Sequence, residues 1–416
     1  MPINIEGLAA VIFALALAHT FASKAIASLA HHSPRHAGVW HLFGEVEIVF
    51  GFWGVVLLVA MALLNGTSEA VQYAESRQYT EPAFVFVVMV VAASRPVLEA
   101  ARKSVLNIAR LLPLPTEAMQ LWLGLSVVPL LGSLITEPAA MTLAALILAP
   151  MIFRSEVPER IKYAVIGVLF VNVSIGGTLT SYAAPPVLMV ASVWQWDSAF
   201  MLTTFGWKSA LAVVVNASAV LFFARRHLIV TAASNDATMP QVPMTVSLIH
   251  LGFLATIVAF AHHPVIFLWV FMFFLGFAQA YERYQSALIL RESLLVAFFL
   301  AGLVLLGGMQ QWWLGPIVSD LSPLALYFGA IGLTAITDNA ALTYLGSLIP
   351  DITDPAKYML VAGAVVGGGL TIIANAPNPA GVALLRSGFQ DESVGAGGLF
   401  LGALPPTIVA AIAFLI

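Results

Sequence analysis

Apolar segments long enough to cross a lipid bilayer recur along the whole chain. A membrane-spanning helix needs roughly 20 mostly apolar residues. Segments of suitable length lie near 6–30, 38–64, 83–111, 160–194, 199–224, 245–262, 264–281, 284–308, 357–385 and 393–416. Only 9% of the 416 residues are charged, against about 25% in soluble domains, so most of the surface must face lipid. The sequence predicts an all-α polytopic membrane protein with about ten transmembrane spans.

The composition also excludes several classes of partner and site. The net charge of −4 is too small to indicate binding to nucleic acid or to an acidic partner. Because cysteine is absent, disulfides, thiolate metal sites and cysteine nucleophiles are excluded. The sequence contains no phosphate-binding loop, nucleophile elbow or H-E-x-x-H motif, so ATP-driven transport and intramembrane hydrolysis have no support. The expected partners are membrane lipid and small ions.

Two nearly identical acidic phrases lie at the centres of two further apolar regions, about 116–153 and 317–349. The phrase "ITEPAAMTL" covers 135–143, and "ITDNAALTY" covers 336–344. The apolar pieces on either side of each phrase are short for a membrane crossing. Each region could form two short spans, but we expect a re-entrant hairpin that returns to the side from which it entered.

The acids in these phrases are the first candidates for an ion site. Aligned without a gap, Thr136 matches Thr337, and Glu137 matches Asp338. An uncompensated carboxylate in the bilayer costs several kcal/mol, so intramembrane acids usually face a cavity and serve an ion or proton path. In the alternative, structural interpretation, the threonines cap a hairpin helix and the acids occupy its first turn. Pro138 also suits a first-turn position, which favours the capping role for Glu137.

A second repeated phrase predicts two broken helices. "GGTLTSYAAPP" covers 176–186 and "GGGLTIIANAP" covers 367–377, each in the middle of an apolar span. Glycine lowers helix stability by about 1 kcal/mol and proline by about 3 kcal/mol. A break at mid-membrane is tolerated only where the backbone is buried in protein or lines a wet cavity, and there freed carbonyls can bind a cation while half-helix amino ends favour anions. The alternative is a packing kink, since both residue types are common in membrane helices.

The order of these elements predicts two inverted repeats. Each half holds spans, a hairpin and a broken helix, with an odd number of crossings, so the second half enters the membrane from the opposite side. The first repeat covers 1–225, with its hairpin at 116–153 and its broken helix at 160–194. A connecting loop covers 226–244. The second repeat covers 245–416, with its hairpin at 317–349 and its broken helix at 357–385.

The basic residues predict the orientation of this layout. Most of the 17 lysines and arginines fall on one predicted side of the membrane. A surplus of basic residues in short loops marks the cytoplasmic side. Both termini are therefore expected outside, the first hairpin is expected to enter from the cytoplasm, and the second from the exterior. A bacterial inner membrane is the expected location.

The second span carries a further group of polar residues. His41 and Glu45 are four residues apart and would share one face of a helix, a spacing that could bind a metal or relay protons. Glu47 follows closely in the same span. The alternative is an inward polar cluster near the cytoplasmic end, held together by hydrogen bonds. His19 and Lys24 in the first span, and Arg95 in the third, are expected to pair with these acids.

These motifs resemble the ion transporter superfamily, which includes sodium/proton antiporters, arsenite permeases and sodium-coupled dicarboxylate and citrate carriers. The matching segments are "GGTLTSYAAPP" and "GGGLTIIANAPNPAG", the latter close to the family's G-G-x-x-T…A-P-N pattern. The resemblance covers nearly the whole chain and is greatest to the sodium/proton antiporter branch. It implies a homodimer, a scaffold of outer spans, and a transport domain of hairpins and broken helices.

A departure from the superfamily pattern bears on the substrate. Carboxylate carriers place Ser-Asn-Thr at the hairpin tips, whereas this chain has Thr-Glu-Pro and Thr-Asp-Asn. Fixed negative charges would repel a dicarboxylate and attract sodium or a proton. The resemblance thus implies exchange of sodium, or another monovalent cation, for protons by an elevator-type alternating-access mechanism. The alternatives are a sodium-coupled symporter of a small anion or carboxylate, with the anion on the backbone of 176–186, and a channel.

The expected ion site combines both kinds of repeated phrase. Asp338 and Asn339 are the expected sodium ligands. The full set of predicted ion- or substrate-binding residues is Thr136, Glu137, Gly176, Gly177, Thr178, Thr180, Thr337, Asp338, Asn339, Gly368, Thr371, Asn375 and Asn378. Glu45 and His41 are candidates for a proton relay. No cofactor is expected beyond the transported Na⁺ and H⁺.

Overall fold

The computed structural model describes residues 5–29, 34–111, 115–228, 240–319 and 321–416. Within these ranges the chain is helical and has no β-strand, which confirms the predicted all-α class. Six helices in the described part are long and apolar enough to cross a membrane, or up to eight if each of two bent helix pairs is one span. The protein is therefore an integral membrane protein. A count of ten spans stays a prediction.

The first half of the chain forms the helices before residue 225. They are α1 (Ile5–Ser28), α2 (Ala37–Phe43), α3 (Val46–Asn65), α4 (Thr67–Glu75), α5 (Thr80–Ala92), α6 (Arg95–Leu111), α7 (Thr116–Leu125), α8 (Val127–Ile135), α9 (Glu137–Ile152), α10 (Glu159–Gly176), α11 (Pro185–Trp194), α12 (Ser198–Met201) and α13 (Trp207–Ala224). A π-helical turn at Leu202–Gly206 joins α12 to α13. The axes of α5 and α6 differ by 63° and those of α7 and α8 by 43°, so these two pairs are bent.

The second half begins after residue 240 and ends with the longest helix of this half. Its helices are α14 (Met244–Ala259), α15 (Pro264–Ala280), α16 (Leu290–Gly307), α17 (Gln311–Ser319), α18 (Pro323–Thr334), α19 (Asn339–Ser347), α20 (Asp354–Gly367), α21 (Asn378–Leu385) and α22 (Ala396–Leu415). Proline stands in the first turn of α15, α18, α20 and α21, where its missing N–H would have no helical partner in any case.

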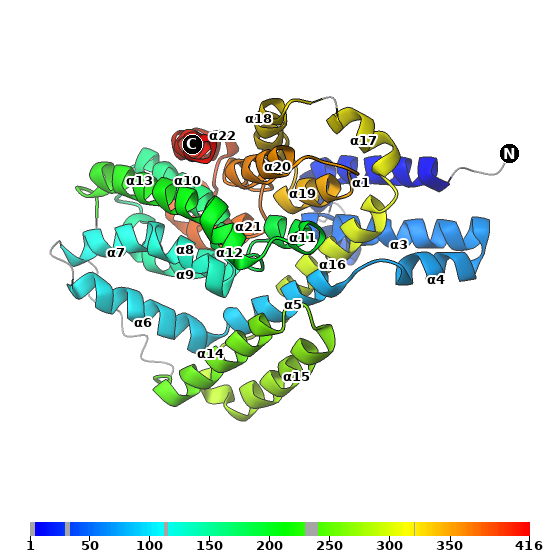
Figure 1. The fold of residues 1–416 in the computed structure, drawn as a ribbon. Coiled ribbons are helices and arrows are strands. Elements are labelled where there is room, and N and C mark those ends of the chain that lie inside the picture. The colour runs from blue at the N-terminus through cyan, green and yellow to red at the C-terminus, as the bar shows by residue number, and fades with distance from the viewer. Residues whose placement is uncertain (1–4, 30–33, 112–114, 229–239, 320) are drawn as a thin grey trace.

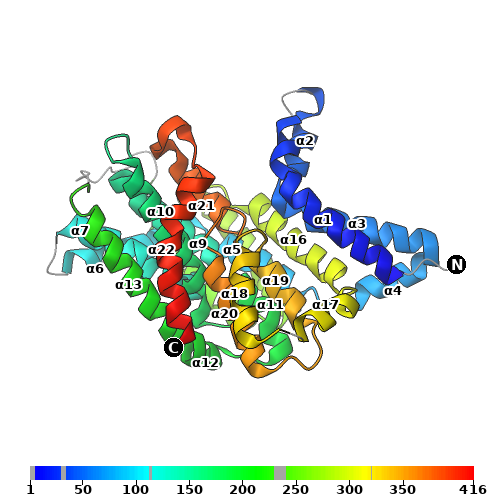
Figure 2. The same ribbon diagram turned by 90° about the horizontal axis from the view of Figure 1, so that it is seen from above.

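The two ends of the molecule are built from different helices. In both views α1, α3 and α4 lie at one end, and α7, α13 and α22 lie at the other (Figures 1 and 2). Helices α11, α19 and α20 lie between these groups, and α16 contacts both α3 and α19. The helix pair α14–α15 projects below the rest in Figure 1 and packs on α5.

Glycines allow close contact between helices at two crossings. A Cβ atom added to Gly167 of α10 would lie 2.3 Å from the carbonyl carbon of Gly402 in α22. One added to Gly302 of α16 would lie 2.1 Å from the carbonyl carbon of Phe50 in α3. Small residues at such crossings let helix backbones approach closely, which is the usual basis of helix association in membranes. The α10–α22 and α3–α16 pairs are thus fixed by backbone contact.

Both predicted helix breaks are present. Helix α10 ends at Gly176, a 3₁₀ turn covers Gly177–Leu179, and α11 begins at Pro185. In the second half α20 ends at Gly367 and the chain is not helical again until Asn378. Each break therefore coincides with a repeated Gly-Gly phrase, as the low helix propensity of these residues predicts.

The regions expected to form hairpins contain helix pairs joined at the acidic phrases. Helices α8 and α9 meet at Thr136 and contact one another. Helices α18 and α19 are separated by residues 335–338 and also contact one another. The first region differs from a simple hairpin because its first limb is divided into α7 and α8. Re-entry to the same membrane side stays a prediction.

The two halves make equivalent contacts. In each half the helix before the acidic phrase packs on the first part of the broken helix, as α8 on α10 and α18 on α20. The second part of each broken helix packs on the other half's helix after the acidic phrase, as α11 on α19 and α21 on α9. This reciprocal pairing is what two repeats would produce. The residue limits of the repeats and their inverted orientation stay predictions.

Candidate functional site

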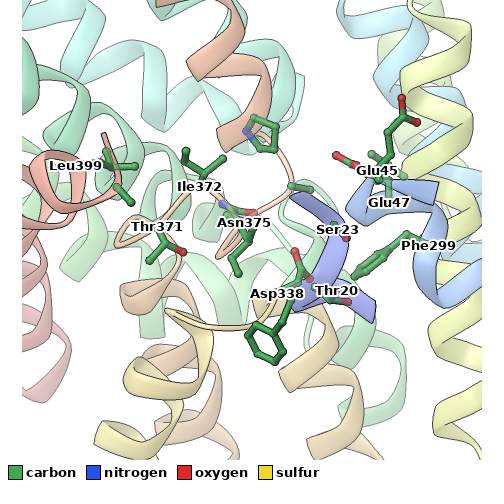
Figure 3. Close-up of a pocket in the computed structure, with 17 residues that line it drawn as sticks. Thr20, Ser23, Glu45, Glu47, Phe299, Asp338, Thr371, Ile372, Asn375 and Leu399 are labelled. Carbon is green, nitrogen blue, oxygen red and sulfur yellow. The ribbon is translucent and has the colours of Figure 1, made fainter. Parts of the chain in front are cut away.

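A cavity of about 440 Å³ lies where the second broken helix faces α1 and α3 (Figure 3). One wall comes from α1, the start of α3, and α16. The other wall comes from Asp338, the non-helical residues 371–376, α21 and α22. The described lining residues are Thr20, Phe21, Ser23, Gly44, Glu45, Glu47, Val296, Phe299, Asp338, Thr371, Ile372, Ile373, Asn375, Ala376, Pro379, Ala396 and Leu399. Three of these are carboxylates and none is basic, so the cavity attracts cations.

Asp338 is the residue that caps α19. Its Oδ1 accepts hydrogen bonds from the backbone N–H groups of Ala340, at 2.8 Å, and Ala341, at 3.2 Å. These bonds satisfy N–H groups that a helix start leaves without partners. The other oxygen, Oδ2, has no hydrogen bond within the described part of the chain, and the residue lines the cavity. One carboxylate oxygen therefore fixes the side chain while the other is available to a ligand.

The predicted threonine caps are wrong. Thr136 occupies the N-cap position of α9, but it makes no side-chain cap bond and its buried Oγ1 has no partner. Its φ of 75° lies in the left-handed region, which a β-branched residue rarely adopts. Thr337 does not cap α19, because its hydroxyl donates to the Leu333 carbonyl oxygen at 2.8 Å. The cap falls on Asp338 in the second half and on no side chain in the first.

Glu137 lies behind the cavity wall and does not line the cavity. Its side chain is fully buried, and its Oε2 accepts a hydrogen bond from Asn375 Nδ2 at 2.8 Å. The second oxygen, Oε1, is buried without a hydrogen-bond partner. A Cβ atom added to Gly177 would lie 2.6 Å from this oxygen, so only glycine fits there. Glu137 thus contacts both broken helices.

Asn375 connects Glu137 to the cavity. Its side chain is 1% exposed, yet it lines the cavity opposite the α1–α3 wall. Its Nδ2 is used by Glu137, whereas its Oδ1 is buried with no hydrogen-bond partner. An orphaned buried oxygen is costly unless a cation, water or donor binds to it. Asn375 therefore offers one oxygen ligand beside Asp338.

The remaining asparagines lie deeper. Asn378 Nδ2 donates to the carbonyl oxygens of Gly368 and Thr371, each at 2.8 Å, and closes the non-helical segment. The backbone N–H of Asn339 donates to the Ala374 carbonyl oxygen at 3.1 Å. The side-chain atoms of Asn339 are buried without partners near Gly368 and do not line the cavity. The structure therefore separates Asn339 from the carboxylate of its neighbour.

The threonines of the broken helices hold the helix breaks against the hairpins. Thr180 Oγ1 donates to the Ser133 carbonyl oxygen at 2.6 Å, and Thr371 Oγ1 donates to the Ala335 carbonyl oxygen at 2.8 Å. Only Thr371 of this pair lines the cavity. Thr178 bonds within its own turn, to Ile175.

Gly176 serves the same junction through its backbone. Its carbonyl oxygen accepts a hydrogen bond from Ser133 Oγ at 2.7 Å. A Cβ atom added to Gly176 would lie 2.5 Å from the Pro129 carbonyl oxygen. Gly176 is therefore placed for packing between α10 and α8 and does not line the cavity.

His41 and Glu45 do not share a helix face. Helix α2 ends at Phe43 and α3 begins at Val46, so Gly44 and Glu45 lie in the break between two helices. His41 is exposed and does not line the cavity. The spacing argument fails because it assumes one continuous helix.

The partner of Glu45 also differs from the predicted ones. Arg291 Nη2 lies 2.6 Å from Glu45 Oε1. Arg95 forms an ion pair with Glu99 at 2.7 Å. His19 Nε2 lies 2.8 Å from the carbonyl oxygen of Phe43. The side chain of Lys24, the third expected partner, lies outside the described part of the structure. The residue that neutralises Glu45 comes from α16, 246 positions along the chain.

Sequence reasoning missed part of the cavity lining. Thr20 and Ser23 of α1 line the cavity beside Glu47 and Asp338. They are three residues apart and so share a helix face. That signal is weak, because threonine and serine commonly bond to their own helix backbone in membrane spans, as these two do.

Comparison with known proteins identifies the family. A family model described as "Putative Na+/H+ antiporter" matches residues 4–416. No curated protein matches the sequence. The match spans nearly the whole chain, including the cavity, both acidic phrases and both broken helices. The chain therefore belongs to the putative Na⁺/H⁺ antiporter family.

Proposed function

We propose that this protein exchanges Na⁺, or another monovalent cation, for protons at Asp338. The observation that carries the proposal is the position of this carboxylate, which lines a cavity whose described lining has no basic side chain. Asn375 and Thr371 line the cavity beside it and supply further oxygen atoms. Oxygen ligands of this kind suit a hard cation.

Competition at one carboxylate would couple the two flows. A cation bound at Asp338 neutralises the charge that would otherwise hold a proton, and a bound proton removes the charge that attracts the cation. A carboxylate in a site of low dielectric gains far more from either partner than it would in water. Exchange then needs no ATP, since each ion leaves when the other binds.

The starts of helices α19 and α11 do not favour the anion-symport alternative. An anion site at a helix start needs free backbone N–H groups. Those at the start of α19 already bond to the Asp338 carboxylate. Helix α11 begins with Pro185 and Pro186, which have no N–H groups to donate. Neither terminus supplies what a carboxylate substrate would need.

We further propose that transport follows an elevator-type mechanism in a homodimer. The cavity separates the wall formed by α1, α3 and α16 from the wall formed by the second broken helix and its neighbours. Movement of the second wall past the first would carry Asp338 between the two membrane faces. The reciprocal contacts of the two halves support such a moving unit, because they tie each broken helix to the other half's hairpin.

Flux through proteoliposomes tests the proposed exchange. With a pH-sensitive dye inside, added external Na⁺ should raise the internal pH as Na⁺ enters and protons leave. The apparent affinity for Na⁺ should weaken as the external pH falls, because protons occupy the same carboxylate. A panel of other cations and of small carboxylates serves as the control. Uptake of an anion with Na⁺, without proton movement, would replace exchange by symport.

A further inference from the structure

The α1–α3 wall carries an acid that the exchange mechanism above does not use. Glu47, in the first turn of α3, lines the cavity together with Glu45. Glu45 is bound to Arg291, so its charge is balanced. Glu47 forms no ion pair among the side chains that the structure describes. Among the described side chains of this wall, Glu47 is therefore the acid that no ion pair balances.

Two hydroxyl groups on α1 complete a set of oxygen ligands on this wall. Thr20 Oγ1 and Ser23 Oγ each donate to a backbone carbonyl oxygen four residues earlier, at 3.1 Å in both cases. A hydroxyl that donates its hydrogen in this way keeps two lone pairs. Because both residues line the cavity, these lone pairs are available to a cation.

The opposite wall offers an independent indication that the cavity holds a cation. The side chain of Asn375 is 1% exposed, lines the same cavity, and carries a buried Oδ1 with no hydrogen-bond partner. In the view of Figure 3, Asn375 and Thr371 lie to one side of Asp338, and Glu45 and Glu47 lie to the other. Residues with acceptor oxygens thus line both sides of the same cavity.

We propose that Glu47, with Thr20 and Ser23, forms a second cation position on the α1–α3 wall, from which the cation passes to Asp338. This inference rests on the proposed exchange and adds a binding step to it. Glu47 and Asp338 both line the cavity, and carboxylates of like charge in one cavity repel each other. A cation between them relieves this repulsion, so each acid strengthens the binding of a cation near the other. Glu47 stays with the α1–α3 wall when the Asp338 wall moves.

The test measures the apparent Na⁺ affinity of exchange at one fixed pH, with Glu47→Gln in proteoliposomes. Loss of this charge should weaken the apparent affinity about tenfold, while the rate at saturating Na⁺ stays within about twofold. Thr20→Val, which replaces the hydroxyl by a methyl group, should weaken the affinity about twofold to threefold. Glu69→Gln, on α4 outside the cavity, removes the same charge as a matched control and should leave the affinity unchanged.

A conservative variant guards against a folding defect. Glu47→Asp keeps the charge, so its apparent affinity should lie nearer to that of the unmodified protein than to that of Glu47→Gln. Exchange by the unmodified protein with an unchanged Na⁺ affinity in Glu47→Gln would overturn this inference and leave the proposed exchange intact. Equal losses in Glu47→Asp and Glu47→Gln would also overturn it, since they would show that the charge is not what matters. Absence of exchange in the unmodified protein would overturn both proposals.

Discussion

Asp338 and Glu137 occupy equivalent positions in the repeated phrases, but their side chains have different surroundings. Asp338 caps α19 with one oxygen and lines the cavity. Glu137 is buried, does not line the cavity, and accepts a hydrogen bond from Asn375, which does. This difference decides which acid a cation entering the cavity meets first. Glu137 and Pro138 lie in the first turn of α9, as the sequence predicts, whereas Asp338 takes the capping role expected of Thr337.

We predict that Asp338→Asn abolishes exchange and that Glu137→Gln retains part of it. The amide at 338 can still accept the cap bonds of α19, but it has no charge with which to bind Na⁺ or a proton. A glutamine at 137 can still accept the hydrogen bond from Asn375 through its amide oxygen. Flux measurements on both variants, normalised to the amount of reconstituted protein, test whether Asp338→Asn loses more exchange activity than Glu137→Gln. Substantial exchange in Asp338→Asn would reassign the carrier acid to Glu137 or Glu47.

Local residue patterns predicted the acids but not their contacts. Glu137 and Asn375 are 238 positions apart, and Glu45 and Arg291 are 246 positions apart. No spacing rule links residues at such distances, since only the folded chain brings them together. The hydrophobic pattern could show that a carboxylate lies in the membrane, but not which oxygen would be left without a partner.

At the scale of the element, prediction succeeded where the signal was local. The breaks after α10 and α20 follow from glycine and proline in the same short phrase. The break between α2 and α3 was missed because a single Gly44 in an apolar segment is a weak signal. Gly44 is needed there for packing, as an added Cβ atom would lie 2.6 Å from that of Ala27.

Replacing Gly177 by alanine should impair exchange through Glu137. The added methyl group would lie 2.6 Å from Glu137 Oε1 and 2.9 Å from Ala184 Cβ, so the carboxylate or the break must shift. Overpacking of this kind typically costs about 1–3 kcal/mol. Gly252→Ala on α14 is the matched control, because no atom lies within 4 Å of its added Cβ atom. Flux and thermal stability in detergent should fall in Gly177→Ala only; equal behaviour of the two variants would contradict the packing argument.

At the scale of the whole molecule, the two halves depend on one another. Helix α11 packs on α19, and α21 packs on α9, so neither broken helix is completed by its own half. The sequence predicted two copies of one unit, because the phrases repeat. It could not predict that each broken helix packs on the hairpin of the other half. The repeat pattern is the same whether each unit packs on itself or on the other unit.

The inverted layout makes a sharp prediction about two equivalent loops. Residues 153–158 join α9 to α10, and residues 348–353 join α19 to α20. If the halves are inverted, these loops lie on opposite sides of the membrane. The first loop should be cytoplasmic, since Arg154 lies in it, Arg160 follows it, and positive charge accumulates on that side.

Single cysteines test this arrangement without interference, because the chain has none of its own. Ser155→Cys should react with a membrane-impermeant maleimide only after the cells are permeabilised, so that the reagent reaches the cytoplasmic face. Thr353→Cys and Ile416→Cys should react from outside in intact cells. All three positions are exposed, so failure to label cannot be attributed to burial. Exchange activity of each variant confirms that the labelled protein is folded. Labelling of Ser155→Cys and Thr353→Cys from the same side would refute the inversion, since an odd number of crossings per half would place the two loops on opposite sides.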